Sequence, residues 1–256
     1  MQDKIPLSVV ILTKNEENGI AECLNSVKWA DEIIVVDDES TDRTREIVKQ
    51  YTSKVFIKKM YIEGKHRNWA YAQAKNLWVL SLDADEMVTP ELKNQINRIL
   101  NSETEYVAFS IPLKNYIGNH WVKYGGWYPA AKVRLFKKDN FMYEEVEVHP
   151  RVFIDGKCGH LSADIIHKGY PDLEHFLNSV NRQSTLEAVK WINTGRKMSL
   201  PHACWRIVDR FFRRYFRKQG YKDGLVGFVV AFFDSLYQLM SYAKYREMLN
   251  ERNRKS

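Results

Sequence analysis

The first hundred residues alternate short, continuous apolar runs with stretches of helical periodicity. Apolar runs at 8–13, 32–37 and 77–82, with a shorter one at 54–57, predict strands that are buried on both faces. Helices are predicted between these strands, with starts or core positions at Asn15, at Ser40 or Thr41, at Ala70 and Ala74, and at Thr89-Pro90. This alternation predicts a mostly parallel, doubly wound sheet with helices on both faces.

The pattern changes twice after residue 100. Shorter strands are predicted at 106–112, 132–136 and 146–154, and a helix at 173–191 is followed by a very basic helical stretch. We therefore expect a sheet domain over residues 1–170 and a helical region over residues 171–256.

Acidic side chains follow two of the predicted strands. Asp37 ends the second strand, and Asp83 and Asp85 follow the strand at 77–82. Because doubly wound sheets bind ligands at the carboxyl ends of their strands, these acids should share one rim. Asp83 and Asp85 are two residues apart and suit a Mg²⁺ or Mn²⁺ that also binds phosphate oxygens. A DxD can also be an ordinary polar loop, but the second acidic strand end favours the metal site.

Composition narrows the class of protein. The 256 residues are 45% hydrophobic and 28% charged, which is ordinary for a folded soluble protein and excludes disorder as the main state. The net charge of +7 indicates an anionic partner such as a nucleotide, a nucleic acid or an acidic membrane surface. Nine Lys or Arg and one acid lie within 196–222, so the excess is concentrated there.

Compartment signals are few. The three cysteines are widely spaced and have no CxxC or metal-ligand spacing, as is typical of the reducing cytoplasm. The N-terminal segment lacks a signal-peptide pattern, and Asp234 interrupts the most apolar later stretch, 225–233. We expect a cytoplasmic protein without a conventional membrane-spanning helix.

Several segments together resemble family 2 glycosyltransferases: SVVILTKNEE, WADEIIVVDDESTDRT, WVLSLDADE, GGWYP and KVRLF. These are inverting enzymes with a nucleotide-diphosphosugar transferase fold of the GT-A type, Rossmann-like and mostly parallel. The order and spacing are similar to bacterial lipopolysaccharide core enzymes that add glucose from UDP-glucose to inner-core heptose. The resemblance covers residues 5–245. It implies a catalytic domain over 1–170, a UDP-sugar donor, a divalent metal, and lipopolysaccharide core or another glycolipid as acceptor.

The resemblance also implies roles for particular residues. Those that match nucleotide-binding positions are Thr13, Glu16, Asp37, Arg67, Asn68 and Asp83. Asp85 matches the metal-binding acid, with His149 and His167 as candidates for a further ligand, although a lone histidine is more often structural. Trp127 and Arg134 match substrate-facing positions. Relatives typically have His-Glu at His149-Pro150 and a small residue at Asp38, so this chain departs from the pattern there.

An inverting transfer needs a base for the acceptor hydroxyl. Glu145 is the first candidate, because it falls nearest the acidic position that relatives have before Val-His, and Glu147 is the second. Strand alternation puts both opposite Val146 and Val148, so a solvated strand face is the alternative.

The basic stretch after residue 196 is amphipathic. On one face lie Cys204, Val208, Phe211, Phe212 and Tyr215, and on the opposite face lie Arg206, Arg210, Arg213, Arg214 and Arg217. This pattern predicts that the helix binds peripherally to the anionic inner face of the cytoplasmic membrane. The alternatives are a helix packed on the catalytic domain with a solvated basic face, and RNA binding by the interleaved arginines and aromatics.

The acidic rim discriminates among the remaining functions. An RNA-binding module leaves the rim unexplained, so no nucleic-acid partner is expected. A nucleotidyltransferase, which also uses a metal, is the enzymatic runner-up, and the family resemblance argues against it.

Overall fold

The computed structural model describes residues 5–146 and 151–255, and it divides into two compact units. Unit 1 comprises Met1–Leu113 and Ala130–His167, and unit 2 comprises Lys114–Pro129 and Lys168–Ser256. The chain therefore leaves unit 1 after Leu113 and returns to it at Ala130. The continuous domain predicted over residues 1–170 is in this respect interrupted.

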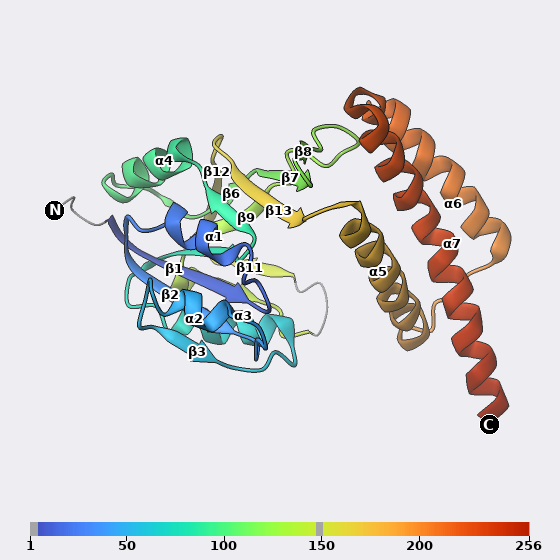
Figure 1. Cartoon of the computed structure of the whole chain (residues 1–256), viewed down its shortest axis with the longest axis horizontal. Helices are drawn as coiled ribbons and strands as arrows, with labels where there is room; N and C mark the ends of the chain where they lie inside the picture. Colours follow the sequence, from blue (N-terminus) through green and yellow to red (C-terminus); the bar gives the residue numbers. More distant parts are fainter. Residues whose placement is uncertain (1–4, 147–150, 256) are drawn as a thin grey trace. The chain divides into compact units, whose positions relative to one another are not determined.

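Unit 1 is built on a seven-stranded sheet with the order β12-β6-β9-β4-β1-β2-β3 (Figure 1). β1 is parallel to β2 and β4, β2 to β3, and β12 to β6, while β9 runs antiparallel to β4 and β6. The strands are β1 (Ile5–Thr13), β2 (Ala30–Asp37), β3 (Val55–Ile57), β4 (Trp78–Asp83), β6 (Tyr106–Ile111), β9 (Lys132–Lys137) and β12 (Lys157–His160). This confirms the expected mostly parallel sheet.

Helices cover both faces of this sheet. They are α1 (Ile20–Ser26), α2 (Thr44–Val48), α3 (Glu63–Ala72) and α4 (Pro90–Leu100). On β1, Leu7, Val9 and Ile11 belong to one apolar cluster with α1, α2 and α4, while Val10 belongs to another with α3. Because successive strand residues point to opposite faces, a strand covered on both sides is mostly apolar. The buried Ser8 of β1 is an exception, and its hydroxyl donates to Glu32.

Smaller strands complete unit 1. β10 (Phe141–Tyr143) pairs antiparallel with β11 (Val152–Ile154), after the short 3₁₀ turn Lys138–Asn140. β5 (Glu86–Val88) pairs antiparallel with the start of β13 (Ile165–Tyr170). Of the strand predicted at 146–154, the described residues form only β11.

The helix starts differ in how well the sequence predicts them. Thr89 is the N-cap of α4 and accepts a hydrogen bond from the Leu92 N–H, with Pro90 at the first helical position, as predicted. The predictions at Asn15 and at Ser40 or Thr41 are wrong, because α1 begins after Gly19 and α2 after Arg43. Asn15 instead adopts a φ of 53° and bonds the 40–41 loop through its backbone and side chain.

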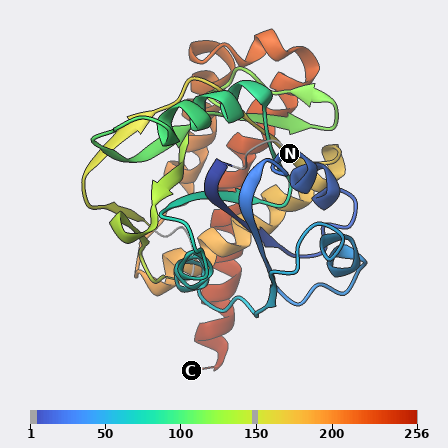
Figure 2. The same cartoon turned by 90° about the vertical axis from the view of Figure 1, so that its left-hand side faces the viewer.

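Unit 2 is mainly helical and also contains two short strands. Its elements are β7 (Leu113–Ile117), β8 (His120–Trp121), α5 (Leu173–Asn193), α6 (Leu200–Phe212), a π-helical turn (Arg213–Arg217), a 3₁₀ turn (Gly220–Asp223) and α7 (Gly224–Lys255). α7 packs against both α5 and α6, and Figure 2 gives a second view of these helices. The apolar cores lie between them, one around Phe176 and Val230 and another around Trp191 and Tyr245.

One helix among the described residues, spanning Gly220–Arg252, is long and apolar enough by length and composition to cross a membrane. The expectation of no conventional membrane-spanning helix is therefore not met when length and composition alone are considered. Only 33% of its most apolar window is buried inside the protein.

Candidate active site

The carboxyl ends of three parallel strands bring the predicted acids to one rim. Thr13 at the end of β1 is in register with Asp37 at the end of β2, and Leu12 is in register with Asp83 at the end of β4. These strand ends are neighbours in the sheet, with β1 in the middle. The rim is therefore a direct result of the strand order.

The part of the rim at Thr13 and Asp37 has unused hydrogen-bonding capacity. Asp37 is fully buried, and its Oδ1 accepts from the Ser40 N–H at 2.9 Å. Among the described residues, neither Asp37 Oδ2 nor the buried Thr13 hydroxyl has a hydrogen-bond partner. Buried polar atoms are seldom left unpaired, so these two atoms are suited to a bound ligand.

Asp38, the residue that departs from the family pattern, does not share this property. Its carboxylate accepts from Lys14 Nζ at 2.8 Å and from the Met60 N–H at 2.8 Å. Asp38 thereby fastens the loop after β2 to Lys14 and to the backbone of Met60.

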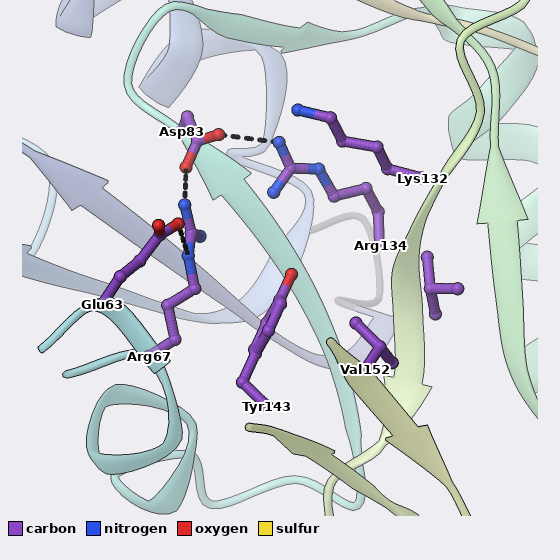
Figure 3. A pocket seen from close by; sticks show the side chains of 8 residues that line it. Glu63, Arg67, Asp83, Lys132, Arg134, Tyr143 and Val152 are labelled. Carbon is purple, nitrogen blue, oxygen red and sulfur yellow. Dashed lines mark hydrogen bonds and ion pairs between the residues drawn. The ribbon is translucent and has the colours of Figure 1, made fainter. Parts of the chain in front are cut away.

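Asp83 is held by two arginines from different elements (Figure 3). Arg67 on α3 donates through Nη2 to Oδ1 at 3.2 Å, and Arg134 on β9 donates through Nη2 to Oδ2 at 2.7 Å. Arg134 also pairs with Glu86, and both of these side chains are almost completely buried. Arg67 is further held by Glu63, one helical turn earlier, at 3.1 Å.

Electrostatics make this cluster permanently charged. Burial raises the pKa of Asp83, but the charges of Arg134 and Arg67 outweigh it and hold the pKa well below the usual carboxyl range. Burial lowers the pKa of Arg134, but Asp83 and Glu86 outweigh it and the pKa lies above the usual arginine value. The expected nucleotide and substrate residues Arg67, Asp83 and Arg134 thus form one ionic cluster, in which Arg134 is buried and Asp83 is partly exposed to the cavity.

A cavity of about 330 Å³ opens above this cluster. Glu63, Arg67, Asp83, Lys132, Arg134 and Tyr143 line it, together with two valines (Figure 3). Arg67 and Arg134 are paired with three carboxylates, Glu63, Asp83 and the adjoining Glu86, and the exposed Lys132 adds a further positive charge. A cavity of this size, with Lys132 at its wall, is suited to part of a polar ligand that carries phosphate.

Asp85 lies in a different environment from Asp83. Its Oδ2 is 3.2 Å from Nε2 of His167 on β13. Burial lowers the pKa of His167, but the hydrogen bond and charge of Asp85 outweigh it, so the pKa is above the usual value. Burial, together with the charges of Asp85, Asp42 and Asp83, raises the pKa of Glu16 to about 7.

These groups form the part of the rim that fits a cation. No cluster of three or more His, Cys, Asp or Glu side chains within residues 5–146 and 151–255 is arranged to hold a metal by itself. Asp85 and His167 nevertheless supply one oxygen and one nitrogen donor side by side, and Glu16 adds a carboxyl group whose pKa is raised first by burial and then by Asp85, Asp42 and Asp83. The donor set therefore fits a divalent ion that takes its remaining ligands from a phosphate.

The other predicted residues fall outside these two groups. Asn68 uses its amide to bond the backbone N–H and C=O of Tyr143, at 2.9 Å each, and so joins α3 to β10. Trp127 belongs to unit 2, where its ring packs on Tyr170 and Phe176. Glu147 and His149 lie outside the described residues.

Glu145 is exposed, and its segment lies against the start of α3. Gly64 allows this contact, because a Cβ at that position would lie 1.8 Å from the Glu144 carbonyl oxygen. The Gly64 N–H also donates to the Val146 carbonyl at 3.5 Å. Only glycine fits at position 64 with the segment in this place.

Four residues at the site were not assigned roles from the sequence: Glu63, Glu86, Lys132 and Tyr143. Two signals were available. Glu86 directly follows the DxD, and Lys132 precedes Arg134 by two positions on one strand, which places both on the same face. Glu63 and Tyr143 carry no comparable pattern.

The sequence pattern described as "Glycosyl transferase family 2" matches residues 8–159, more than half of the chain. The chain belongs to this family. The matched residues include Thr13, Asp37, Asp85 and the Arg67–Asp83–Arg134 cluster, whereas His167 lies beyond them.

Relatives extend the similarity to unit 2. An uncharacterised glycosyltransferase of Rickettsia typhi is 31% identical over 96% of this chain and 89% of its own length. LpsC of Rhizobium meliloti, a lipopolysaccharide core biosynthesis glycosyltransferase, is 25% identical over 95% of this chain and 93% of its own length. This family 2 glycosyltransferase is therefore similar to both proteins over nearly their whole lengths.

Solved structures support the fold. The mannosyltransferase PcManGT of Pyrobaculum calidifontis, determined with GDP-Man and Mn²⁺, has a TM-score of 0.52 and 13% identity, covering 94% of this chain and 87% of its own. Glucosyl-3-phosphoglycerate synthase of Mycobacterium tuberculosis has a TM-score of 0.50 and 15% identity, covering 75% and 81%. At these identities the likeness concerns the GT-A-type fold alone.

The ionic cluster makes a prediction about stability. Arg134→Met leaves the buried Glu86 without its cationic partner and Asp83 with Arg67 alone, so the free energy of unfolding at neutral pH should fall by about 3–5 kcal/mol. Urea unfolding measures this. The exposed pair Arg151–Glu144 provides the control, because Arg151→Met should cost less than about 1 kcal/mol. Equal losses in the two variants would contradict the proposed importance of the cluster.

The pH dependence of that loss has a defined sign. The folded-state pKa of Asp83 is depressed, so its ion pairs stabilise the fold above the unfolded pKa of about 4 and lose this effect as pH falls through the lower folded value. The deficit of Arg134→Met should therefore be largest near neutral pH and shrink below about pH 4.

Proposed function

We propose that this family 2 glycosyltransferase transfers a hexose, glucose from UDP-glucose in our first choice, to an inner-core heptose of lipopolysaccharide. Membership of the family and the acidic rim beside a cationic cavity support sugar transfer. The similarity to LpsC supports the acceptor class. Transfer of another UDP-sugar to a cell-surface glycan or glycolipid is the alternative.

Nucleotide recognition is assigned to the deep part of the rim. The unpartnered Asp37 Oδ2 is an acceptor, as the N–H of a uracil ring requires, and the Thr13 hydroxyl can donate or accept beside it. Glu16 lies on the adjoining loop, where its backbone N–H donates to Thr44 at 2.7 Å. The nucleotide assignment rests on one observation: in the described residues, Asp37 Oδ2 and Thr13 Oγ1 are both buried and both lack a hydrogen-bond partner.

The diphosphate is assigned to the space between Asp85 and the cavity. Asp85 and His167 would hold a Mg²⁺ or Mn²⁺, which, when bound, offsets the negative charge of the departing diphosphate. His167 must release its proton to bind such an ion, because its pKa is raised by Asp85 in the free protein. Lys132 and Arg134 extend the positive field from the cavity side.

The base is assigned to Glu145. Its exposure leaves the carboxylate open to an acceptor, and the contact of Gly64 with Glu144 fixes the backbone next to it. In this role Glu145 takes the proton from the attacking heptose hydroxyl as the glycosidic bond forms at the anomeric carbon and the bond to UDP breaks. Glu147 is the second candidate.

Location follows from the acceptor and from the charge. We place the protein in the cytoplasm, bound peripherally to the anionic inner face of the cytoplasmic membrane. The excess of Lys and Arg in residues 196–222 supports this location. Lipopolysaccharide precursors are themselves held in a membrane, so an enzyme bound there meets its acceptor directly.

The metal assignment predicts the outcome of Asp85→Ala. Metal-dependent transfer should fall by at least about 100-fold, because the charge stabilisation supplied through Asp85 is lost, while the circular dichroism spectrum stays unchanged. Asp31→Ala removes an acid that pairs with Lys75 outside the site, and it should keep wild-type turnover. Full turnover by Asp85→Ala in Mn²⁺ or Mg²⁺ would contradict the assignment.

The base assignment predicts a contrast between neighbours. Glu145→Gln should lower kcat by about 100-fold or more with little change in UDP-glucose binding, because only proton transfer is impaired. Glu144→Gln alters the adjacent residue, whose carboxylate pairs with Arg151, and it should change kcat little. Near-normal turnover of Glu145→Gln would move the role to Glu147 or elsewhere.

The acceptor assignment predicts a change in the cell. Deleting the gene should remove one hexose from the inner core of lipopolysaccharide, as measured by mass spectrometry of the purified core. Complementation with the wild type should restore the hexose, and complementation with Asp85→Ala should not. An unchanged core in the deletion strain would exclude this acceptor while leaving UDP-sugar turnover in vitro to be tested separately.

A further inference from the structure

Unit 2 exposes an unusually large set of apolar side chains. We define the aromatic stripe as the residues of α6, its π-helical turn and α7 that are listed here: Trp205, Val208, Phe212, Phe216, Leu225, Phe228 and Phe232. Each is between 41% and 78% exposed. Exposed apolar surface of this extent on a folded protein indicates a binding surface.

The stripe is continuous across the two helices. Phe228 of α7 packs on Phe211 of α6 and on Tyr215 of the π-helical turn, with ring centroids 5.9 and 5.7 Å apart. Phe211 in turn contacts Phe212 and Phe216. One connected aromatic surface therefore joins α6, the π-helical turn and α7, and the stretch from Trp205 to Phe216 is roughly 16 Å long.

The arginines of α6 lie in two sectors. Arg214 turns toward α7 and pairs with Asp234 at 2.8 Å, and Arg210 covers the ring of Tyr237 at 5.6 Å. Arg206 is half-buried, whereas Arg213, Arg217, Lys218 and Lys222 are exposed, and Arg213 pairs with Asp209 at 3.2 Å. The exposed surface is thus aromatic in its middle and cationic at its edge.

The contacts of α7 favour a packed helix over a spanning one. Ser235, Gln238 and Ser241 are buried within unit 2, and Lys244 donates to Asn181, Ser184 and Thr185 of α5. Ser235 and Ser241 donate to carbonyls of α7 itself, whereas the hydrogen bonds of Lys244 exist only while α7 packs against α5. A charged pair such as Arg214–Asp234 would also be costly within a bilayer core.

We infer that the aromatic stripe inserts into the headgroup region of an anionic phospholipid bilayer, with the exposed lysines and arginines on the phosphates, and that α7 does not cross the membrane. Aromatic side chains beside cationic ones match the polarity gradient of that region. This inference deepens the proposed location and rests on it for its biological context, but the surface itself is independent of the sugar-transfer chemistry.

Vesicle sedimentation with the full-length protein tests the surface. Wild type should bind vesicles containing phosphatidylglycerol and bind pure phosphatidylcholine far less, with binding weakened at about 1 M salt, where charges are screened within about 3 Å. Phe212→Ser with Phe216→Ser should weaken binding by about tenfold or more. Arg217→Gln should weaken it by about fivefold, and only for anionic vesicles.

Controls separate this inference from the others. Leu77→Ser changes an exposed apolar residue of unit 1, 49% exposed, and should bind vesicles as wild type does. UDP-glucose hydrolysis should be unchanged in the stripe variants, so lost membrane binding with normal hydrolysis isolates the stripe from the catalytic proposal. Failure of hydrolysis in wild type would instead reject the proposed function alone.

Four results would overturn the inference. The first is that the wild type does not bind anionic vesicles at low salt. The second is that membrane-bound protein resists extraction with alkaline carbonate, which would make α7 a spanning helix. The others are stripe variants that lose RNA binding in a gel shift, or that convert a dimer to a monomer in sedimentation velocity, while vesicle binding is unchanged.

Discussion

The rim of the sheet depends on how the charge of Arg134 is buried. A guanidinium enclosed in protein must be paired and hydrogen-bonded, because the cost of removing it from water is otherwise too large. Asp83 and Glu86 provide the pairs, and Asp83 also binds Arg67. This one requirement joins β9, β4, β5 and α3, so the position of the cavity floor follows from charge pairing as much as from apolar packing.

The same requirement gives the two acids of the DxD, Asp83 and Asp85, different charged partners. Asp83 already has two cations supplied by the protein, so an added cation gains little there. In the described part of the chain Asp85 pairs with His167, and burial, followed by the charges of Asp85, Asp42 and Asp83, raises the pKa of Glu16 to about 7. A cation gains most where the protein supplies the least positive charge, which is the Asp85 side of the rim.

Sequence patterns predicted the parts of the fold that depend on local periodicity. The strands that are apolar on both faces and the Thr89-Pro90 helix start were correct because their signals lie within a few residues. The helix starts at Asn15 and Ser40 were wrong because both side chains bond across to the other loop, a contact between strands that local sequence does not reveal. Convergence of Asp37 and Asp83 was predictable from topology, whereas the capture of Asp83 by Arg67 and Arg134 depends on long-range contacts.

The helix α6 shows why amphipathic pattern alone leaves orientation open. Periodicity separates arginines from aromatic residues, but either face can be buried when the right partners exist. Here Asp234 and Tyr237 of α7 receive Arg214 and Arg210, and the long aliphatic part of an arginine side chain packs well while its charged end finds a partner. The protein thereby buries charge that it can pair and leaves aromatic surface exposed. Because contact of apolar surface with water is unfavourable, covering that surface with an apolar partner or phase lowers the free energy.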